Sequence, residues 1–476
     1  MALKLTPYGA ASTVTGSNFM VETLPAVPAH AGQAGDTAKV LVDCGMEQGA
    51  DFCEKAMYEK FPYDPSTVDA LVLTHAHLDH VGRIPKLVRE GFRGKLFMTE
   101  PTKDLAALIL QDSVGILSED AKRLGVDPLF TQEDVDATLP LIETIEYHEE
   151  KEIAPGLTAY LRNTGHILGS ASVRLTDTSD GSSIALTGDL GNSPSPLLPD
   201  FEPIPDADAV LMESVYGDRV HPDRQHRVER LRDTLKAAID RGGTILIPAF
   251  SIERTQLMLY ELSNFFEAGD LPKLPVYLDS PLAINVTRVY DKWGAKYFKD
   301  AAQDEMKREG SLFDFPFLTK TLSREESREI EHDHRQKIII AGAGMSHGGR
   351  IGIWETKYLS DPKTSLIIVG YQAPGSPGRR MAEGDKKVRL HGQDVSVRAH
   401  VEILEGWSGH ADRDGLMQFA EESLKGGRAK TIFVAIGEPS AERFLAQRIH
   451  DYLGGHAVVP ESLEAWTVSK GAVQRA

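Results

Sequence analysis

The sequence contains almost no cysteine. Only two of its 476 residues are cysteines, Cys44 and Cys53, and their separation fits neither a zinc ribbon nor a C-x-x-C redox motif. Two cysteines also cannot form the disulfide framework of a small secreted domain. We therefore expect both to be small buried hydrophobic residues, and the sequence excludes the disulfide-stabilised class of proteins.

Long apolar runs are also missing. No stretch reaches the roughly eighteen uncharged residues that a membrane-spanning helix needs, and the N-terminal segment has no basic region followed by an apolar one, as a secretory signal would have. We therefore predict a cytoplasmic protein without membrane partners. A chain of 476 residues is too long for one ordinary core, so we expect two or three domains.

Basic residues are in the minority. There are 52 Lys and Arg against 70 Asp and Glu, which gives a formal net charge of -18. This balance argues against a protein that coats nucleic acid nonspecifically, because attraction to phosphates grows with clustered Lys and Arg. A polyanionic substrate would have to be met locally, by bound metal ions or by a few arginines.

The sequence does contain a dense group of metal-binding side chains, directly after the apolar run 70–73. Residues 74–80 read Thr-His-Ala-His-Leu-Asp-His and offer four potential ligands: His75, His77, Asp79 and His80. Imidazole and carboxylate suit zinc and similar divalent ions. At a strand end, positions 75 and 77 point one way while the next turn directs 79 and 80 elsewhere, so one segment can serve two adjacent metals. The pattern predicts a metallohydrolase; the alternative is a polar loop that happens to hold histidines.

Apolar strand-like runs alternate with helical patterns along the chain, which is typical of an α/β fold. The predicted strands are 39–42, 70–73, 184–187, 210–213, 244–248, 337–341, 365–370 and 431–435. Two amphipathic helices are expected, one carrying Val228, Leu231, Leu235 and Ile239, and one carrying Met258, Leu262 and Phe265. Residues 25–37, rich in Ala, Gly and Pro, predict an exposed loop.

Three further candidate ligands follow predicted strands far apart in the sequence: Asp43, His166 and Asp189. A sheet can gather such loops into one site, and a glycine next to or near each residue permits a tight turn. Taken alone, an aspartate at such a position is most often a turn residue. Together with the histidine cluster, the three are better explained as parts of a metal site.

The order Asp43, H-x-H-x-D-H at 75–80, His166 and Asp189 resembles the metal motifs of the metallo-β-lactamase superfamily. That resemblance implies an α/β fold, an αβ/βα four-layer sandwich. Two later motifs, Glu213–Gly217 and Trp407–Asp412, resemble those that flank the inserted α/β domain of the β-CASP group, which are nucleases that process nucleic acids. Further segments resemble the same group: 247–250, 254–256, 278–282, 344–350, 369–375 and 378–380. The resemblance covers nearly the whole chain and is strongest to RNA-processing members related to the cleavage and polyadenylation endonuclease subunit.

The resemblance also implies roles for individual residues. His75, His77 and His166 would hold one metal, Asp79 and His80 the second, and Asp189 would bridge the two. Asp43 would orient a ligand or the bound water, a metal-bound hydroxide would attack phosphorus, and His410, held protonated by Glu213, would act as general acid. From the sequence alone, His410 could instead cap the helix expected from Asp412 to Leu424. The cofactor implied is Zn²⁺, one or two ions per chain, with Mn²⁺ as an alternative.

One position departs from this family pattern. Where the second metal usually has a histidine ligand, the chain reads Val434-Ala-Ile436-Gly-Glu438, and isoleucine cannot coordinate a metal. Three explanations stay open: two metals with a weak second site, a single metal, or an inactive relative that serves as a scaffold. Retention of the other motifs, His410 included, favours an enzyme.

The glycine-rich segment 342–350 predicts a tight loop whose backbone N–H groups and Arg350 contact substrate phosphates. A dinucleotide fingerprint is a poor match because the glycine spacing is wrong, and a purely structural turn is the other alternative. The residues predicted to bind substrate are Ser346, Gly348, Gly349, Arg350, Arg254 and Ser408.

The predicted domains are a metallo-β-lactamase domain formed by residues 1–208 and 394–476, and a β-CASP domain formed by residues 209–393. The predicted function is hydrolysis of phosphodiester bonds in single-stranded RNA, since an unpaired strand can thread a narrow cleft. The alternatives are a noncatalytic RNA-binding scaffold, which Ile436 favours, and a small-molecule metallohydrolase. RNA is the expected partner, and a homodimer is compatible with the resemblance.

Overall fold

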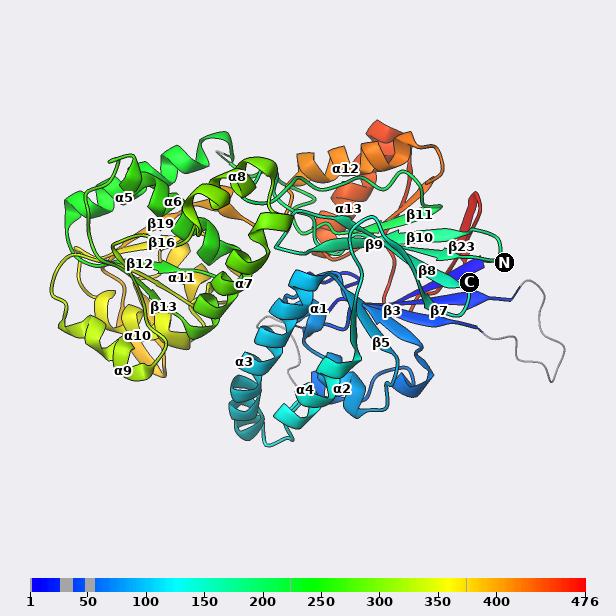
Figure 1. Ribbon diagram of the computed structural model, residues 1–476, viewed down its shortest axis with the longest axis horizontal. Helices are drawn as coiled ribbons and strands as arrows, with labels where there is room; N and C mark the ends of the chain where they lie inside the picture. Colours follow the sequence, from blue (N-terminus) through cyan, green and yellow to red (C-terminus); the bar gives the residue numbers. More distant parts are fainter. Residues whose placement is uncertain (1, 26–36, 48–55, 223, 374) are drawn as a thin grey trace. The chain divides into compact units, whose positions relative to one another are not determined.

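The structure is a computed structural model that describes residues 2–25, 37–47, 56–222, 224–373 and 375–476. The chain forms two compact units (Figure 1). Unit 1 comprises Met1–Gln48, Phe52–Val220 and His410–Ala476, and unit 2 comprises Gly49–Asp51 and His221–Gly409. Cys44 is buried, as predicted, whereas Cys53 and most of the predicted loop, residues 26–36, lie outside the described residues.

Unit 1 contains two large sheets. The first has the strand order β23 (Ala472–Arg475), β22 (Trp466–Ser469), β1 (Ala2–Gly9), β2 (Asn18–Leu24), β3 (Lys39–Val42), β4 (Ala70–Val72), β5 (Lys95–Met98) and β6 (Ile142–Thr144). The second has the order β21 (His456–Val458), β20 (Thr431–Val434), β11 (Ala209–Met212), β10 (Ser183–Leu186), β9 (Ala171–Asp177), β8 (Leu157–Asn163) and β7 (Glu150–Ala154). The central strands are buried along their whole length, which explains their continuous apolar sequences.

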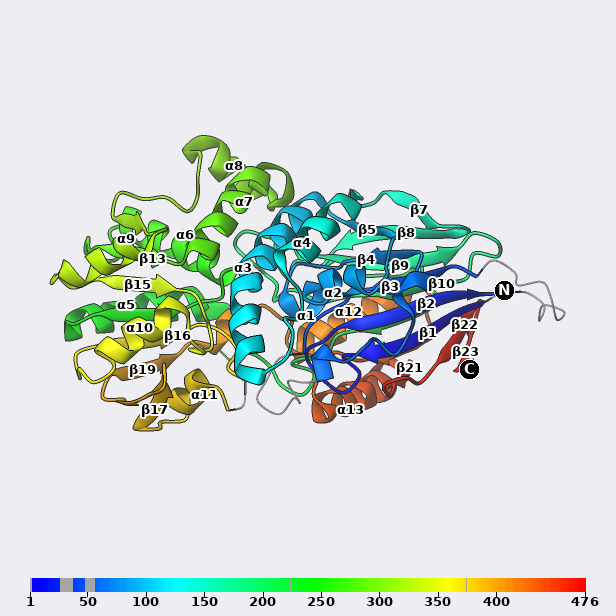
Figure 2. The ribbon, with the colours of Figure 1, turned by 90° about the horizontal axis from the view of Figure 1, so that it is seen from below.

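Helices cover the outer sides of both sheets (Figures 1 and 2). Those beside the first sheet are α1 (Leu78–Val81), α2 (Ile84–Arg89), α3 (Glu100–Leu124) and α4 (Gln132–Thr138). Those on the second are α12 (Arg413–Lys425) and α13 (Pro439–Arg448). Leu416 and Phe419 of α12 share one core with Val210 of β11 and Ile432 of β20. The predicted αβ/βα sandwich is therefore confirmed.

Unit 2 contains a parallel sheet with the order β14 (Leu318–Lys320), β13 (Val276–Asp279), β15 (Ile338–Ala341), β12 (Ile245–Pro248), β16 (Ser365–Ile368) and β19 (His400–Ile403). A separate hairpin joins β17 (Lys387–Leu390) and β18 (Gln393–Ser396). The helices are α5 (Arg227–Arg241), α6 (Arg254–Glu267), α7 (Pro281–Tyr297), α8 (Asp300–Glu309), α9 (Arg324–Glu329), α10 (Gly349–Tyr358) and α11 (Pro377–Ala382). The inserted region is therefore an α/β unit, as predicted.

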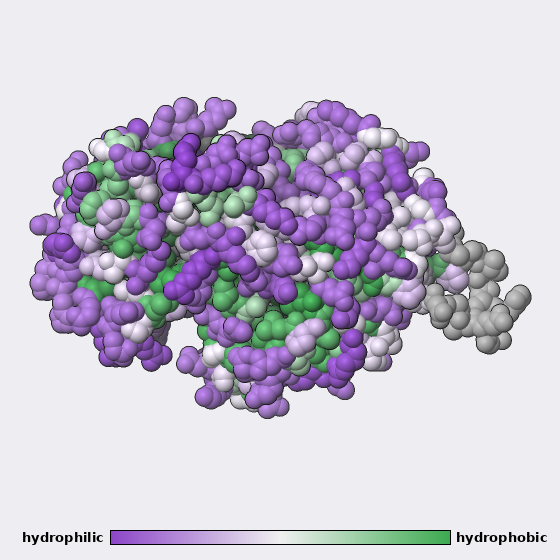
Figure 3. All heavy atoms as spheres, viewed as in Figure 1, coloured by the Kyte–Doolittle hydropathy of each residue, from purple (hydrophilic) through white to green (hydrophobic). Residues whose placement is uncertain are grey.

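The eight predicted strands correspond to β3, β4, β10, β11, β12, β15, β16 and β20. The predicted apolar face of α5 was wrong at Val228. The helix buries Leu231, Leu235 and Ala238, while Val228 in its first turn is 37% exposed. No helix among the described residues is both long and apolar enough to cross a membrane. Figure 3 shows a face covered mainly by hydrophilic residues, in keeping with the charge of the chain.

The boundaries between the compact units lie after Val220 and Gly409, whereas the predicted domain boundaries lie after residues 208 and 393. The prediction assigned β11 to the β-CASP domain, but β11 pairs within the second sheet of unit 1. It assigned β19 to the metallo-β-lactamase domain, but β19 pairs within the sheet of unit 2. The two divisions use different criteria, packing and sequence motifs, so the domain boundaries stay a prediction.

Two buried carboxylates organise the polar interior of unit 2. Asp279 accepts hydrogen bonds from Arg350 Nη1 at 2.6 Å and from Trp354 Nε1 at 2.8 Å, and the hydroxyls of Thr321 and Ser327 complete its shell. These contacts join β13 to α9 and α10, so the carboxylate fixes the helices on the sheet.

Glu355 of α10 is the second buried carboxylate. Its Oε1 accepts a hydrogen bond from Ser346 Oγ at 2.6 Å, while its Oε2 has no hydrogen-bond partner among the described residues. Burial raises the pKa of Glu355 to about 8. The folded protein therefore holds this proton at a pH at which the unfolded chain has released it.

Replacing Glu355 with Gln should remove part of the pH dependence of stability. A raised carboxyl pKa means that the folded state binds more protons than the unfolded state from about pH 4.5 to about pH 8, so the free energy of unfolding falls as pH rises across that window. Urea midpoints of Glu355→Gln should decline less over this range than those of the wild type. The exposed Glu325→Gln on α9 is the control and should keep the wild-type slope; equal slopes for all three proteins would contradict the prediction.

Candidate metal centre

The candidate ligands of unit 1 all follow the carboxyl ends of strands. Asp43 follows β3, His75 follows β4, and His166 comes after β8. Asp189 comes after β10, and Glu213 directly follows β11. The loops at this end of both sheets therefore bring together residues that lie far apart in the sequence.

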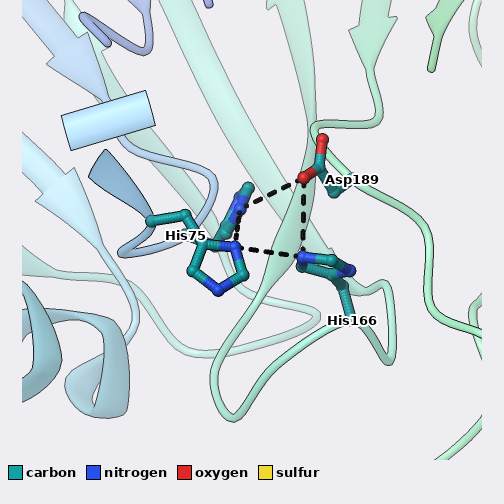
Figure 4. Close-up of side chains that lie close together, drawn as sticks. His75, His166 and Asp189 are labelled. Carbon is teal, nitrogen blue, oxygen red and sulfur yellow. Dashed lines mark hydrogen bonds and ion pairs between the residues drawn. The ribbon is translucent and has the colours of Figure 1, made fainter. Parts of the chain in front are cut away.

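His75, His77, His166 and Asp189 form a tight cluster, in which one atom of each lies within 4.8 Å of the others. His77 Nδ1 lies 3.1 Å from both His75 Nε2 and His166 Nε2. Asp189 Oδ2 lies 3.4 Å from His75 Nε2 and 3.5 Å from His166 Nε2. Figure 4 shows the labelled side chains of His75, His166 and Asp189 converging. Three imidazoles and one carboxylate are a donor set suited to a divalent ion.

The protonation of the cluster fits the same use. Burial lowers the pKa of His75, and it lowers the pKa values of His77 and His166 well below their ordinary range. These imidazoles are therefore neutral at neutral pH, which is the form that coordinates metals.

A network behind the cluster fixes the orientation of two rings. The Asp43 carboxylate lies 2.7 Å from His80 Nδ1 and accepts hydrogen bonds from Ser17 Oγ and from the hydroxyl and N–H of Thr74. Because the Thr74 hydroxyl donates to Asp43, its oxygen is left to accept a hydrogen bond from His75 Nδ1, 3.1 Å away. One carboxylate thus orients His80 directly and His75 through Thr74, and it leaves Nε2 of each ring facing the cluster.

Two buried atoms of this region have no hydrogen-bond partner in the part of the chain that the structure describes. His80 Nε2 and Asp189 Oδ1 lie 3.3 Å apart, yet neither has a hydrogen-bond partner among the described residues. Burial opposes a charge on His80, but the carboxylates of Asp189 and Asp43 outweigh it and raise the pKa of His80 well above its ordinary range. A cation bound here would replace that proton and satisfy both atoms, so the residues fit a metal site.

The set predicted for the second metal is looser. Asp79 Oδ2 lies 3.9 Å from His80 Nε2, and Asp79, His80 and Asp189 do not form a group as tight as the first cluster in the part of the chain that the structure describes. Asp189 instead forms a second tight group with Glu213 and His410. The first metal site is therefore the better-formed one.

Beside Asp189 lies a histidine–carboxylate pair. His410 Nδ1 lies 3.3 Å from Glu213 Oε1, which also accepts a hydrogen bond from Leu190 N. Burial alone would lower the pKa of His410, but Glu213 and Asp189 outweigh burial and raise that pKa to about 9. The His410 imidazole is therefore protonated at neutral pH and can donate a proton. It does not cap α12, because Asp412 accepts the capping hydrogen bond from Gly415 N.

Three family models match successive segments of the chain. The "Metallo-beta-lactamase superfamily" model matches residues 33–95, the "Beta-Casp domain" model matches residues 255–381, and the "Zn-dependent metallo-hydrolase RNA specificity domain" model matches residues 394–460. The chain is 37% identical to Ribonuclease TTHA0252 of Thermus thermophilus, over 88% of this chain and 91% of that protein. The chain belongs to the β-CASP family of metallo-β-lactamase proteins.

A second relative and a solved structure also match the chain. The chain is 31% identical to Transcription termination factor FttA of Thermococcus kodakarensis, over 97% of this chain and 71% of that protein. A crystal structure of a protein of unknown function from Enterococcus faecalis V583 matches with a TM-score of 0.53 at 11% identity, covering 98% of this chain and 100% of that one. At that identity the match supports the fold alone.

The β-CASP departure at Ile436 has a structural signature. Ile436 is buried and has a φ of +51°, a left-handed conformation that is a genuine outlier for a β-branched residue. Its N–H donates to Ala10 O, and its carbonyl accepts from the N–H of Ser214, the residue after Glu213. A hydrocarbon side chain therefore stands at a conformationally unusual position whose backbone is bonded to the residue after Glu213.

The residues predicted to bind substrate lie in unit 2, where three of their side chains already have partners. Ser346 Oγ donates to Glu355, Arg350 pairs with Asp279, and the buried Arg254 donates to the carbonyl of Trp407. Ser408 is also buried. Gly348 and Gly349 have φ values of +124° and +60° and lead into α10. Substrate phosphates would have to compete with these contacts, and the predicted roles stay predictions.

Sequence reasoning missed Thr74. Its position directly before His75 is the only signal that the sequence offers, because the contact to Asp43 spans 31 residues. In the structure Thr74 is 1% exposed, its carbonyl accepts from Ala171 N, and a Cβ on Gly188 would lie 2.7 Å from its side chain. Thr74 is thus a positioning residue that links Asp43 to His75.

Replacing Thr74 with Val should weaken metal binding by roughly 10- to 100-fold, the usual cost of losing a partner behind a ligand. Valine keeps the shape but removes the hydroxyl that links Asp43 to His75. Chelator competition with zinc measures the affinity without any substrate. Thr74→Ser should retain most of the affinity, and Thr138→Val, which removes another buried hydroxyl of unit 1, should bind like the wild type. Equal affinities for Thr74→Val and Thr74→Ser would show that the hydroxyl is not needed.

Proposed function

We propose that this β-CASP protein is a metal-dependent ribonuclease that hydrolyses phosphodiester bonds of single-stranded RNA. The observation that carries the proposal is the convergence of His75, His77, His166 and Asp189 beside the His410–Glu213 pair. The sequence identity with a protein named as a ribonuclease supports RNA as the substrate.

The ligands proposed for the first metal ion are His75, His77 and His166. Those proposed for a second ion are Asp79 and His80, and Asp189 would serve both ions. We propose Zn²⁺ as the physiological ion, because imidazole-rich sets suit zinc, with Mn²⁺ as the alternative. Divalent ions bound there supply Lewis acidity, which activates water and offsets charge on the phosphate.

We propose that His410 donates the proton that the reaction needs. A departing ribose oxygen needs a proton, and His410 holds one at neutral pH because Glu213 lies against its Nδ1. Glu213 is itself fixed, since its two oxygens accept hydrogen bonds from Leu190 N and Val215 N. His410 would then be the general acid, and Glu213 the group that orients it.

One observation favours a second candidate, a noncatalytic RNA-binding scaffold: Ile436 removes a metal ligand from the β-CASP pattern. The intact His410–Glu213 pair favours an enzyme, because RNA binding alone does not require a proton donor beside the metal ligands. We also propose that the protein is cytoplasmic and forms a homodimer. Sedimentation equilibrium measures the oligomeric state.

His77→Ala should lower RNA cleavage by at least about a hundred-fold, because it removes the ring that lies against both other imidazoles of the cluster. The assay is incubation of end-labelled single-stranded RNA with metal-reconstituted protein, with products resolved by length. His148→Ala is the control, since His148 lies on the surface of unit 1 in an ion pair with Glu202. Undiminished cleavage by His77→Ala, or an inactive wild type that binds RNA, would overturn the proposal.

Ile436→His should raise the metal content of dialysed protein from about one ion to about two per chain, because it adds an imidazole where the family pattern has one. Histidine also tolerates a positive φ better than isoleucine, so the variant should fold at least as stably. Elemental analysis gives the stoichiometry, and Ile436→Val is the control that adds no ligand. A wild type that already retains two ions would contradict the expectation.

A further inference from the structure

A half-buried arginine of unit 1 has no polar partner among the described residues. The guanidinium of Arg448, at the end of α13, makes no hydrogen bond or ion pair with the described residues, and its Nε is buried without a partner. Arginine carries five N–H donors in a rigid fork. In a chain with a net charge of -18, a guanidinium that no described carboxylate contacts is unexpected.

Two aromatic rings hold this guanidinium instead. Arg448 Cζ lies 5.8 Å from the centre of the Phe444 ring and 4.6 Å from that of Tyr452, both within cation–π range. Phe444 is 41% exposed and Tyr452 is 69% exposed, so each ring keeps surface open to solvent. We call Phe444, Arg448 and Tyr452 the ring stripe.

The helical backbone places the three residues of the ring stripe in a row. Its members are spaced four residues apart, along α13 and the single π-helical turn η7 (Ile449–Leu453) that continues it. Turns of this rare type occur frequently at functional sites. Figure 2 shows α13 along the lower edge of unit 1.

The neighbouring charges leave the ring stripe positive. Asp451 is the acid closest to the ring stripe in the sequence. Its Oδ1 accepts a hydrogen bond from Gln447 Nε2 at 2.8 Å and lies 3.0 Å from His450 Nδ1, so this oxygen is directed to those groups and not to Arg448. Arg443, next to Phe444, is exposed. Exposed rings around a guanidinium that no described carboxylate pairs with match single-stranded nucleic acid, in which phosphates accept hydrogen bonds from charged donors and bases stack on rings.

We propose that the ring stripe binds single-stranded RNA outside the metal centre, with Arg448 on a phosphate and the rings of Phe444 and Tyr452 on bases. This inference rests on the proposed function, because it takes RNA as the ligand. Its location supports it, since the carbonyl of Ile436, shortly before α13, accepts a hydrogen bond from the N–H of Ser214, the residue after Glu213. Phe444 follows Pro439 by about 8 Å along the helix axis. An RNA strand that leaves the centre along α13 would meet the ring stripe.

The test is fluorescence anisotropy with a labelled oligouridylate of about 16 nucleotides, in a His77→Ala background so that the RNA stays intact. Arg448→Gln and the double variant Phe444→Ala/Tyr452→Ala should each raise the dissociation constant about ten-fold. Arg448→Gln should also reduce the salt dependence by about 0.7 in log–log slope, as expected for one lost phosphate contact to a single strand. Phe444→Tyr and Tyr452→Phe keep the rings and should bind like the parent.

The matched control is Arg123→Gln on α3, which removes the same charge from an exposed ion pair with Asp120. If Arg448→Gln weakens binding no more than Arg123→Gln does, the ring stripe is not an RNA site. If the ring variants leave RNA binding intact but dissociate a dimer in sedimentation equilibrium, the surface is an interface between copies and the inference is overturned.

Failure of this inference can be told apart from failure of the proposed function. A wild type that cleaves RNA, while the ring stripe variants bind it as tightly as the parent, overturns the inference alone. A wild type that neither binds nor cleaves RNA overturns both. Thermal unfolding of each variant, followed by circular dichroism, identifies any loss of binding that comes from misfolding.

Discussion

The buried carboxylate of Asp43 accepts hydrogen bonds from Ser17 and Thr74 and faces His80 Nδ1, while its own backbone adopts a φ of +62°. Such a conformation costs energy, and here the surrounding hydrogen bonds hold it in place. Through these contacts the carboxylate sets the orientation of one imidazole in each predicted metal site. The rest of the centre can be gathered from distant loops because this point is fixed.

The electrostatics of the centre explain how an acidic chain can act on a polyanion. The cluster histidines are neutral and the adjoining carboxylates are buried, so the protein alone offers a phosphate little attraction at this point. Divalent ions reverse the local sign without changing the charge of the surrounding surface. Binding of a phosphate at the centre would therefore depend on metal loading, whereas the proposed contacts of Arg448, which has no carboxylate partner among the described residues, would not need the metal.

The fold could be predicted from the sequence, and so could the strand-end positions of the four residues that converge in the tight cluster, for reasons that are local. Buried parallel strands give continuous apolar runs, and the ligands follow strand ends directly. Partners distant in the sequence could not be predicted: Arg350 was expected to contact phosphate, yet it pairs with Asp279, 71 residues away. The link from Asp43 to His75 through Thr74 was missed for the same reason. Val228 fitted a helical period but lies exposed in the first turn of α5, because periodicity identifies a face and not its ends.

The insertion of unit 2 between Glu213 and His410 has a consequence during synthesis of the chain. Domains begin to fold from the N-terminal side as the chain leaves the ribosome, and the four members of the tight cluster are all present once Asp189 has emerged. His410 follows only after the whole of unit 2, and β20, which pairs with β11, comes later still. The nascent chain can therefore gather this cluster well before His410 is made, so that assembly of the candidate metal site and arrival of the proposed proton donor are separated in time by the synthesis of an entire domain.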